Sequence, residues 1–157
     1  MLNIYTVSFF GHRELTHFVD IQEQLEKLIR QLLEKKEYVE FLVGRNGAFD
    51  SLVSSVIRMV KREYRDDNSC HILVLPYYTK EYSYNISYFE KFFDEVEICK
   101  ESENAFFKSA IQIRNKNMVD RSDLTVFYIE KESGGAYSTY KYAQKHKKEI
   151  IKISSSL

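Results

Sequence analysis

The chain reads LTVFYIEKESGGAYSTYKYAQKHK from residue 124 to residue 147, and this stretch decides the fold. Residues 124–129 form a short apolar and β-branched run, which is typical of a buried strand. Gly134 and Gly135 follow it, and a helical pattern begins at about residue 136. A strand that leads through glycines directly into a helix is the repeating unit of a parallel α/β sheet.

The same alternation of strand and helix patterns continues along the rest of the chain. Strands are predicted at 4–10, 40–43, 71–75, 96–99 and 150–153, and helices at 17–36, 49–60, from about 86, and at 104–119. The pattern predicts an α/β, three-layer fold with a mainly parallel sheet of about five to seven strands and helices on both faces. Because 157 residues include only one Pro and five Gly, we expect one domain over 1–157.

Composition narrows the classes of function. The chain has 23 Lys plus Arg and 23 Asp plus Glu, so its formal net charge is +0, which argues against nucleic acid as a partner and against a polybasic membrane anchor. No signal peptide is visible, and the longest aliphatic run, 72–75, is too short to cross a membrane, so we expect a cytoplasmic protein. No Cys/His cluster has metal-binding spacing, so neither metal nor cofactor is expected.

All five glycines lie where predicted strands end: they are Gly11, Gly44, Gly47, Gly134 and Gly135. In parallel α/β sheets, ligands bind outside the carboxyl ends of the strands. The glycines therefore predict a binding site along one edge of the sheet. His12 and Arg13 follow the first strand there, and His12 is a candidate general acid or phosphate donor.

The loop at 133–139 has the features of a phosphate site. Glycines let the backbone approach a ligand closely, and a helix N-terminus offers unpaired N–H groups. Ser133, Ser138 and Thr139 add hydroxyl donors. A plain strand-to-helix turn capped by a serine is the alternative reading.

The loop from Gly44 to Asp50 is the second glycine-containing link between a strand and a helix. Arg45 is a candidate charge partner for an anion, and Asp50 a candidate acceptor for a ribose hydroxyl. Asp50 has an alternative role as an acidic residue favoured at a helix N-terminus. Neither loop contains a Walker lysine motif or a GxGxxG motif.

Arg114 lies on the apolar face of the predicted helix 104–119, between Ile111 and Met118. A buried guanidinium needs a partner. That partner is either a carboxylate, such as Asp120 or Asp123, or an anionic ligand, since arginine suits bidentate phosphate recognition.

Four segments in order resemble the YpsA-like proteins of the SLOG superfamily. Residues 10–13 resemble their TGHR opening, 44–50 their GGAxGFD loop, 114–123 their RNxxMVDxSD segment, and 134–143 their GGT…YA helix start. This set covers nearly the whole chain. The resemblance implies a Rossmann-like fold and a crevice that binds nucleotides or nucleotide-derived ligands.

The superfamily also contains the Lonely-guy phosphoribohydrolases and the DNA-processing protein DprA. Phosphoribohydrolases carry a catalytic glutamate in a PGGxGTxxE motif, whereas the helix after Gly135 has no acidic residue before Glu149. The second loop is also less glycine-rich here, since Arg45 and Asn46 separate its glycines. Binding or sensing of a nucleotide-derived small molecule is therefore preferred. A phosphoribohydrolase (N-glycosidase) is the alternative, and a DprA-like binder of single-stranded nucleic acid is the third reading.

Residues and resemblance together predict one ligand site, and a homodimer is compatible with the sequence. The predicted ligand-binding residues are Gly11, His12, Arg13, Gly44, Arg45, Gly47, Asp50, Arg114, Asn115, Ser133, Gly134, Gly135, Ser138 and Thr139.

Overall fold

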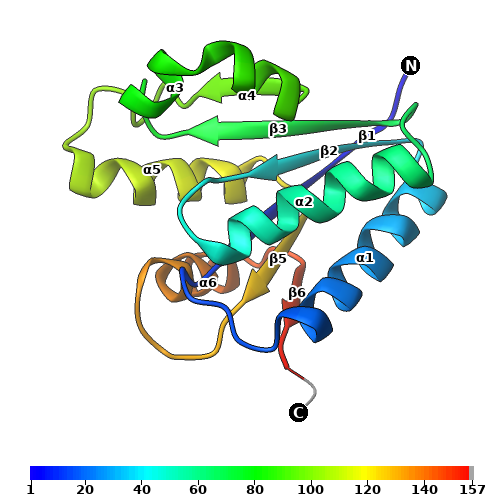
Figure 1. The fold of residues 1–157 in the computed structure, drawn as a ribbon. Coiled ribbons are helices and arrows are strands. Elements are labelled where there is room, and N and C mark those ends of the chain that lie inside the picture. Colours follow the sequence, from blue (N-terminus) through cyan, green and yellow to red (C-terminus); the bar gives the residue numbers. More distant parts are fainter. Residues whose placement is uncertain (156–157) are drawn as a thin grey trace.

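The computed structural model describes residues 1–155 and contains a six-stranded sheet in which every paired strand is parallel (Figure 1). The strands are β1 (Ile4–Gly11), β2 (Tyr38–Val43), β3 (Ser69–Leu75), β4 (Glu95–Ile98), β5 (Leu124–Tyr128) and β6 (Ile150–Ile153). The helices are α1 (Phe18–Lys35), α2 (Ala48–Glu63), α3 (Lys80–Tyr84), α4 (Ile86–Phe92), α5 (Phe107–Asp120) and α6 (Gly135–Lys145). The predicted α/β class is confirmed.

The strand order is β4-β3-β2-β1-β5-β6. Strands β2 to β4 are added on one side of β1 and the last two on its other side, so the order of connection switches at β1. The chain builds outward from β1 to β4, then returns through α5 to place β5 against the free side of β1. Val7 pairs with Leu124 and Gly11 with Tyr128 in that register. A reversal of this kind opens a crevice at the carboxyl ends of the two strands, which is where ligands bind in such folds.

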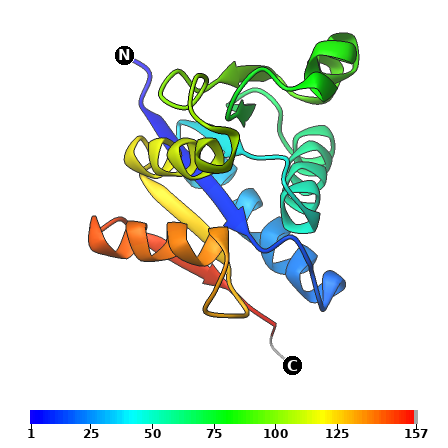
Figure 2. The ribbon, with the colours of Figure 1, turned by 90° about the vertical axis from the view of Figure 1, so that its left-hand side faces the viewer.

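Alternation along the strands divides the core between the two faces of the sheet. On β1, Val7 and Phe9 pack with α1 and α2, whereas Phe10 packs on the opposite face with residues of α5 and α6. Figure 2 looks at the carboxyl edge and shows α5 and α6 on one side of β1, with α1 and α2 on the other. Both faces are covered, as a parallel sheet requires.

The long helices largely follow the predicted spans, and the differences have local causes. α5 begins at Phe107 rather than at 104, because Ser102 holds the preceding chain in a turn by donating to Pro76 O at 2.6 Å. The stretch 77–93 contains two short helices instead of one. Thr79 caps the first, since its hydroxyl accepts the Tyr82 N–H at 3.1 Å.

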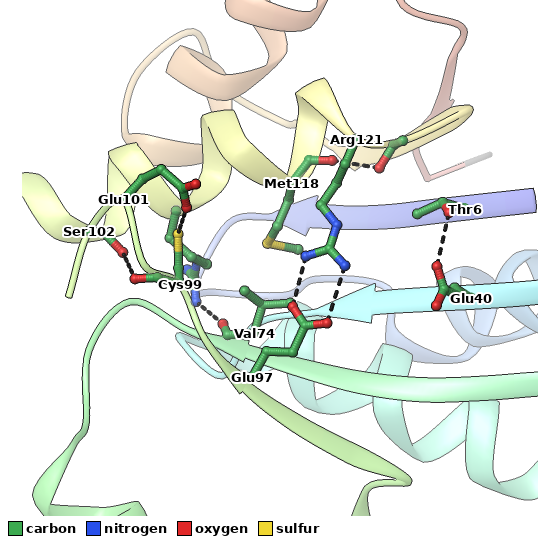
Figure 3. Close-up of polar contacts among 11 residues, drawn as sticks. Thr6, Glu40, Val74, Glu97, Cys99, Glu101, Ser102, Met118 and Arg121 are labelled. Carbon is green, nitrogen blue, oxygen red and sulfur yellow. Dashed lines mark hydrogen bonds and ion pairs between the residues drawn. The ribbon is translucent and has the colours of Figure 1, made fainter.

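The end of α5 is fixed to the sheet by polar contacts. The Arg121 guanidinium donates to both carboxylate oxygens of Glu97 on β4, at 2.7 and 3.2 Å (Figure 3). Ser122 Oγ donates to Ser8 Oγ on β1 at 2.8 Å. These contacts hold α5 across the sheet, with its first turn at the carboxyl edge (Figure 2).

Candidate functional site

A cavity of about 490 Å³ lies at the carboxyl ends of the strands, beside the reversal point. Its walls come from the end of β1, the β2–α2 loop, α5 and the β5–α6 loop. The predicted site residues that line it are Gly11, His12, Arg13, Gly44, Asp50, Arg114, Asn115, Gly134 and Gly135. Four segments far apart in sequence thus meet here, and their role in binding a ligand stays a prediction.

The N-terminus of α6 opens onto this cavity through Gly134, Gly135 and Ala136. Gly134 has φ 90°, a backbone conformation that favours glycine strongly. The N–H groups of a first helical turn have no partner within the helix, and the helix dipole makes this end positive. The wall at α6 therefore suits an anionic group.

Arg114 is buried, and its guanidinium forms three hydrogen bonds to protein atoms. Its guanidinium donates to Val74 O at 2.8 Å, to Asn46 Oδ1 at 3.2 Å and to Asn115 Oδ1 at 3.1 Å. One side chain thus ties α5 to the end of β3 and to the β2–α2 loop. Arg114 shapes the cavity wall from behind.

Asn115 continues these contacts to α6. Its amide donates to Thr139 Oγ1 at 3.2 Å, and the Thr139 hydroxyl donates to Gly135 O at 3.0 Å. Thr139 is fully buried and lies outside the cavity lining. Its role is to position the first turn of α6.

Asp50 is the carboxylate that faces Arg114. A β-carbon on Gly44 would lie 3.0 Å from Asp50 Oδ2 and 3.3 Å from Arg114 Nη1, so the two charged groups flank the same glycine. Burial raises the pKa of Asp50, and the Asn46 N–H and the Arg114 charge oppose that rise. Asp50 accepts the Asn46 N–H at 2.8 Å and so closes the loop onto α2.

The suggested carboxylate partners of Arg114 were wrong. Asp120 accepts the Tyr142 hydroxyl at 2.7 Å, and Asp123 accepts the Thr6 N–H at 2.8 Å. Both lie at the far end of α5, where the helix ends and β5 begins. Asp50 was instead predicted as a ribose acceptor, and its pairing across the loop could not be read from sequence spacing.

Three exposed cations stand around the cavity: Arg13, Lys108 and Lys131. Within residues 1–155 none of them forms an ion pair. Glu14 is the exposed carboxylate among the lining residues. Because the charges of Asp50 and Arg114 face each other, the accessible walls carry an excess of positive charge.

His12 lines the cavity as a neutral imidazole. Its Nε2 accepts the Lys131 N–H at 3.3 Å, so the ring proton is on Nδ1. Burial lowers the pKa of His12, and the nearby Lys131 charge lowers it further. A hydrogen-bond donor that is neutral near pH 7 fits this environment better than a general acid does.

Several predicted residues lie outside the cavity lining: Arg45, Gly47, Ser133, Ser138 and Thr139. Arg45 turns to α3 and α4, where it donates to Glu81 at 2.8 Å and covers the Phe89 ring at 4.8 Å. Gly47 abuts the backbone of Arg13, and a β-carbon there would overlap it. Gly47 therefore lets two loops of the site pack together.

Sequence reasoning missed Lys108, Gln112 and Lys131 in the lining. Lys131 lies between β5 and Gly134, and reading that whole loop as part of the strand end would have included it. Lys108 and Gln112 are not near a strand end in the sequence, so the strand-end rule could not identify them. Their position at the cavity depends on the path of α5 in the crossover from β4 to β5.

The cavity walls offer backbone N–H, guanidinium and ammonium donors, which match anionic oxygens. Within the described residues, no three His, Cys, Asp or Glu side chains gather as a metal site. In the same part of the chain, no helix is long and apolar enough to span a membrane.

No protein-family model matches the chain, and no curated protein matches it either. Among solved structures, the chain is similar to DNA processing protein A from Helicobacter pylori, which was described for its single-stranded DNA binding mode. The TM-score is 0.67 with 17% sequence identity, over 98% of this chain and 66% of that one. This chain thus spans slightly less than two thirds of that protein's length.

This similarity corrects one expectation. The zero net charge of the whole chain was taken to argue against nucleic acid as a partner, but a protein of the same fold binds single-stranded DNA. Zero net charge over a whole chain does not exclude nucleic acid, because charge can be concentrated locally on one surface. The chain has the Rossmann-like α/β fold of DNA processing protein A.

Proposed function

We propose that the chain binds a nucleotide or nucleotide-derived small molecule, with its phosphate in the cavity against the N-terminus of α6. The observation that carries this proposal is the meeting of that helix end with Arg13, Lys108 and Lys131 in one cavity. A volume of about 490 Å³ is within the range of small-molecule sites.

The phosphate position follows from where the donors lie. The first turn of α6 supplies oriented N–H groups, and Lys131 stands three residues before Gly134 on the same loop. Fixed N–H groups and mobile ammonium groups commonly share the oxygens of one phosphate. Hydrogen bonds that run from Asn46 through Arg114 and Asn115 to Thr139 hold the first turn of α6 in place.

The resemblance to YpsA-like proteins supports the same site. Residues 11–13, Gly44, Asp50, 114–115 and 134–135 belong to the resembling segments, and all line the cavity. We place the chain with these proteins on that basis.

Single-stranded nucleic acid is the second candidate, favoured by the fold shared with DNA processing protein A. A polynucleotide would place one of its phosphates where a free nucleotide places its own. The two candidates differ in salt dependence, since an oligonucleotide neutralises several cations at once.

Calorimetric titration with the four nucleoside 5′-monophosphates, ribose 5-phosphate and an oligothymidylate tests the proposal. The variant Lys108→Gln/Lys131→Gln should lose at least about tenfold in affinity, because hydrogen bonds to charged groups contribute about 1.5–3 kcal/mol each. Lys27→Gln, an exposed lysine on α1, is the matched control.

Each outcome of these titrations identifies the class of ligand or the activity. Saturable monophosphate binding that the double variant weakens supports the small-molecule proposal. Oligonucleotide binding with a steep salt slope and no monophosphate binding favours the second candidate. Release of ribose 5-phosphate would identify a hydrolase, and failure of every ligand to bind would refute the proposal.

A further inference from the structure

Two aromatic rings at the start of α5 are exposed. Phe106 and Phe107 expose 75% and 62% of their surface, and neither belongs to the core clusters of the two sheet faces. Their rings stack on each other, with centroids 6.1 Å apart and planes inclined by 19°. Together they form a flat apolar surface in water.

Phe107 lies on the stripe of α5 that lines the cavity, one helical turn beyond the lining residues. Ile111, Asn115 and Met118 are the cavity-lining residues of one α5 stripe, and Phe107 precedes Ile111 by one helical turn. Lys108, its neighbour in sequence, also lines the cavity. The first turn of α5 stands at the carboxyl edge of the sheet (Figure 2), so Phe107 extends the lining stripe outward.

We infer that Phe107 is the base-stacking residue of the nucleotide site, an inference that rests on the proposed function. The cavity carries three exposed cations, which suit phosphate and sugar, and its aromatic lining residues, Phe9 and Phe10, are buried in the core, whereas a nucleobase needs an exposed flat apolar partner. The exposed ring beside Lys108 provides this partner one helical turn outside the lining. The phosphate then lies inside and the base at the rim.

The local charge favours a nucleobase over a second copy of the chain as the cover for this ring. A symmetric dimer through Phe107 would bring Lys108 of each copy to the same interface, where like charges repel. A nucleotide carries negative charge next to its aromatic plane. It therefore complements both the ring and the lysines around the mouth.

The test compares adenosine 5′-monophosphate with ribose 5-phosphate, which lacks the base. Stacking of a base contributes about 1–3 kcal/mol, so the full chain should prefer the former by about 5- to 150-fold. Phe107→Ala should abolish this preference and leave the affinity for ribose 5-phosphate unchanged. Phe107→Trp should restore it.

Tyr84→Ala is the control, because Tyr84 is an 82% exposed aromatic residue on α3 that does not line the cavity. If Phe107→Ala keeps the preference of the unmodified chain, the stacking inference is overturned and the proposed function stands. If the unmodified chain binds neither compound, the proposed function fails first. If sedimentation shows that Phe107→Ala converts a dimer to a monomer with the preference intact, a second copy covers the ring and the inference is wrong.

Discussion

Helices α2 and α5 both begin beside the cavity, but they meet the sheet with different surfaces. The buried face of α2 is almost wholly apolar, with Phe49, Val53 and Ile57 among its fully buried residues. The buried face of α5 includes Arg114 and Asn115 between Ala110 and Met118. The two helices thus contribute differently: α2 supplies apolar packing, and α5 supplies polar contacts to β3, the β2–α2 loop and α6.

This difference shows that polar residues replace apolar packing on the part of α5 that lies beside the cavity. A buried arginine costs desolvation energy unless its donors are satisfied, and here Val74 O on β3, Asn46 Oδ1 in the β2–α2 loop and Asn115 Oδ1 on α5 accept from it. The polar face is therefore stable only when the β2–α2 loop and α6 occupy their places. Packing under α2 does not depend on the loops in this way.

The largest expected effect is on α5. Arg114→Ala removes three hydrogen bonds from a buried site and leaves the half-buried Asp50 without its facing charge, so we expect the free energy of unfolding to fall by about 3–5 kcal/mol without ligand. Urea denaturation measures this. Asp50→Asn/Arg114→Met should be less destabilised than Arg114→Ala, since neither charge then remains buried. Undiminished stability with weakened nucleotide binding would instead assign Arg114 to the ligand.

The α2 side contains one buried polar pair, His71 Nε2 with Ser54 Oγ at 3.1 Å. Burial, with Lys61 and Arg58 nearby, lowers the pKa of His71 to about 3 although Asp94 opposes the shift. Stability present above the unfolded-state pKa of about 6.5 is lost as pH falls toward 3, at about 1.4 kcal/mol per pH unit.

His71→Gln isolates this loss on acidification. At pH 4.5 the unmodified chain should have lost about 2–3 kcal/mol more than the variant, each relative to its own value at pH 7.5. Parallel slopes for the two proteins between these pH values would show that His71 does not govern acid stability. Asp50 acts in the opposite direction, because its raised pKa favours the folded state as pH falls.

A smaller effect is expected from trimming the apolar face of α2. Ile57→Val removes one methylene from a fully buried side chain and should cost about 0.5–1.5 kcal/mol, with little change in affinity for a nucleotide. Thermal and urea unfolding measure the first quantity, and calorimetry the second. A loss of affinity beyond the change in folded fraction would show that α2 packing also positions the cavity.

The smallest effect is at the end of α5. Arg121→Gln breaks the partly exposed contact with Glu97 and should cost about 0.2–1 kcal/mol, less at high salt. A loss above 2 kcal/mol would mean that this contact holds the helix on the sheet and that α5 depends on polar anchors at both ends.

The sequence predicted the fold well because apolar periodicity reports on burial, and the long helices and all strands but the edge strand β4 contain buried residues. It also indicated the edge of the sheet at which the cavity lies, since glycines accumulate where strands end. It did not reveal that Arg114 faces Asp50, which is 64 residues away in the chain. This proximity depends on how α2 and α5 are placed on the sheet, which the spacing of residues along the chain does not determine.

Arg45 and Lys108 also show that the sequence does not determine side-chain direction. Arg45 was predicted at the cavity and does not line it, whereas Lys108 was not predicted and does. Arg45 lies in the expected loop but turns toward Glu81 and Phe89, because α3 and α4 pack beside it. Lys108 lies on a helix that no strand-end rule covers, yet it reaches the cavity. Loop membership is readable from sequence, whereas side-chain direction follows from tertiary neighbours.

The placement of β5 against β1 has a consequence for how the protein matures during synthesis. Thr6 donates its N–H to Asp123, 117 residues later, and one cavity wall comes from β1 while the facing walls come from α5 and the start of α6. A nascent chain that has emerged only through β4 can align four strands but has no cavity. The cavity therefore forms late, after the last third of the chain has left the ribosome and closed over the first strand.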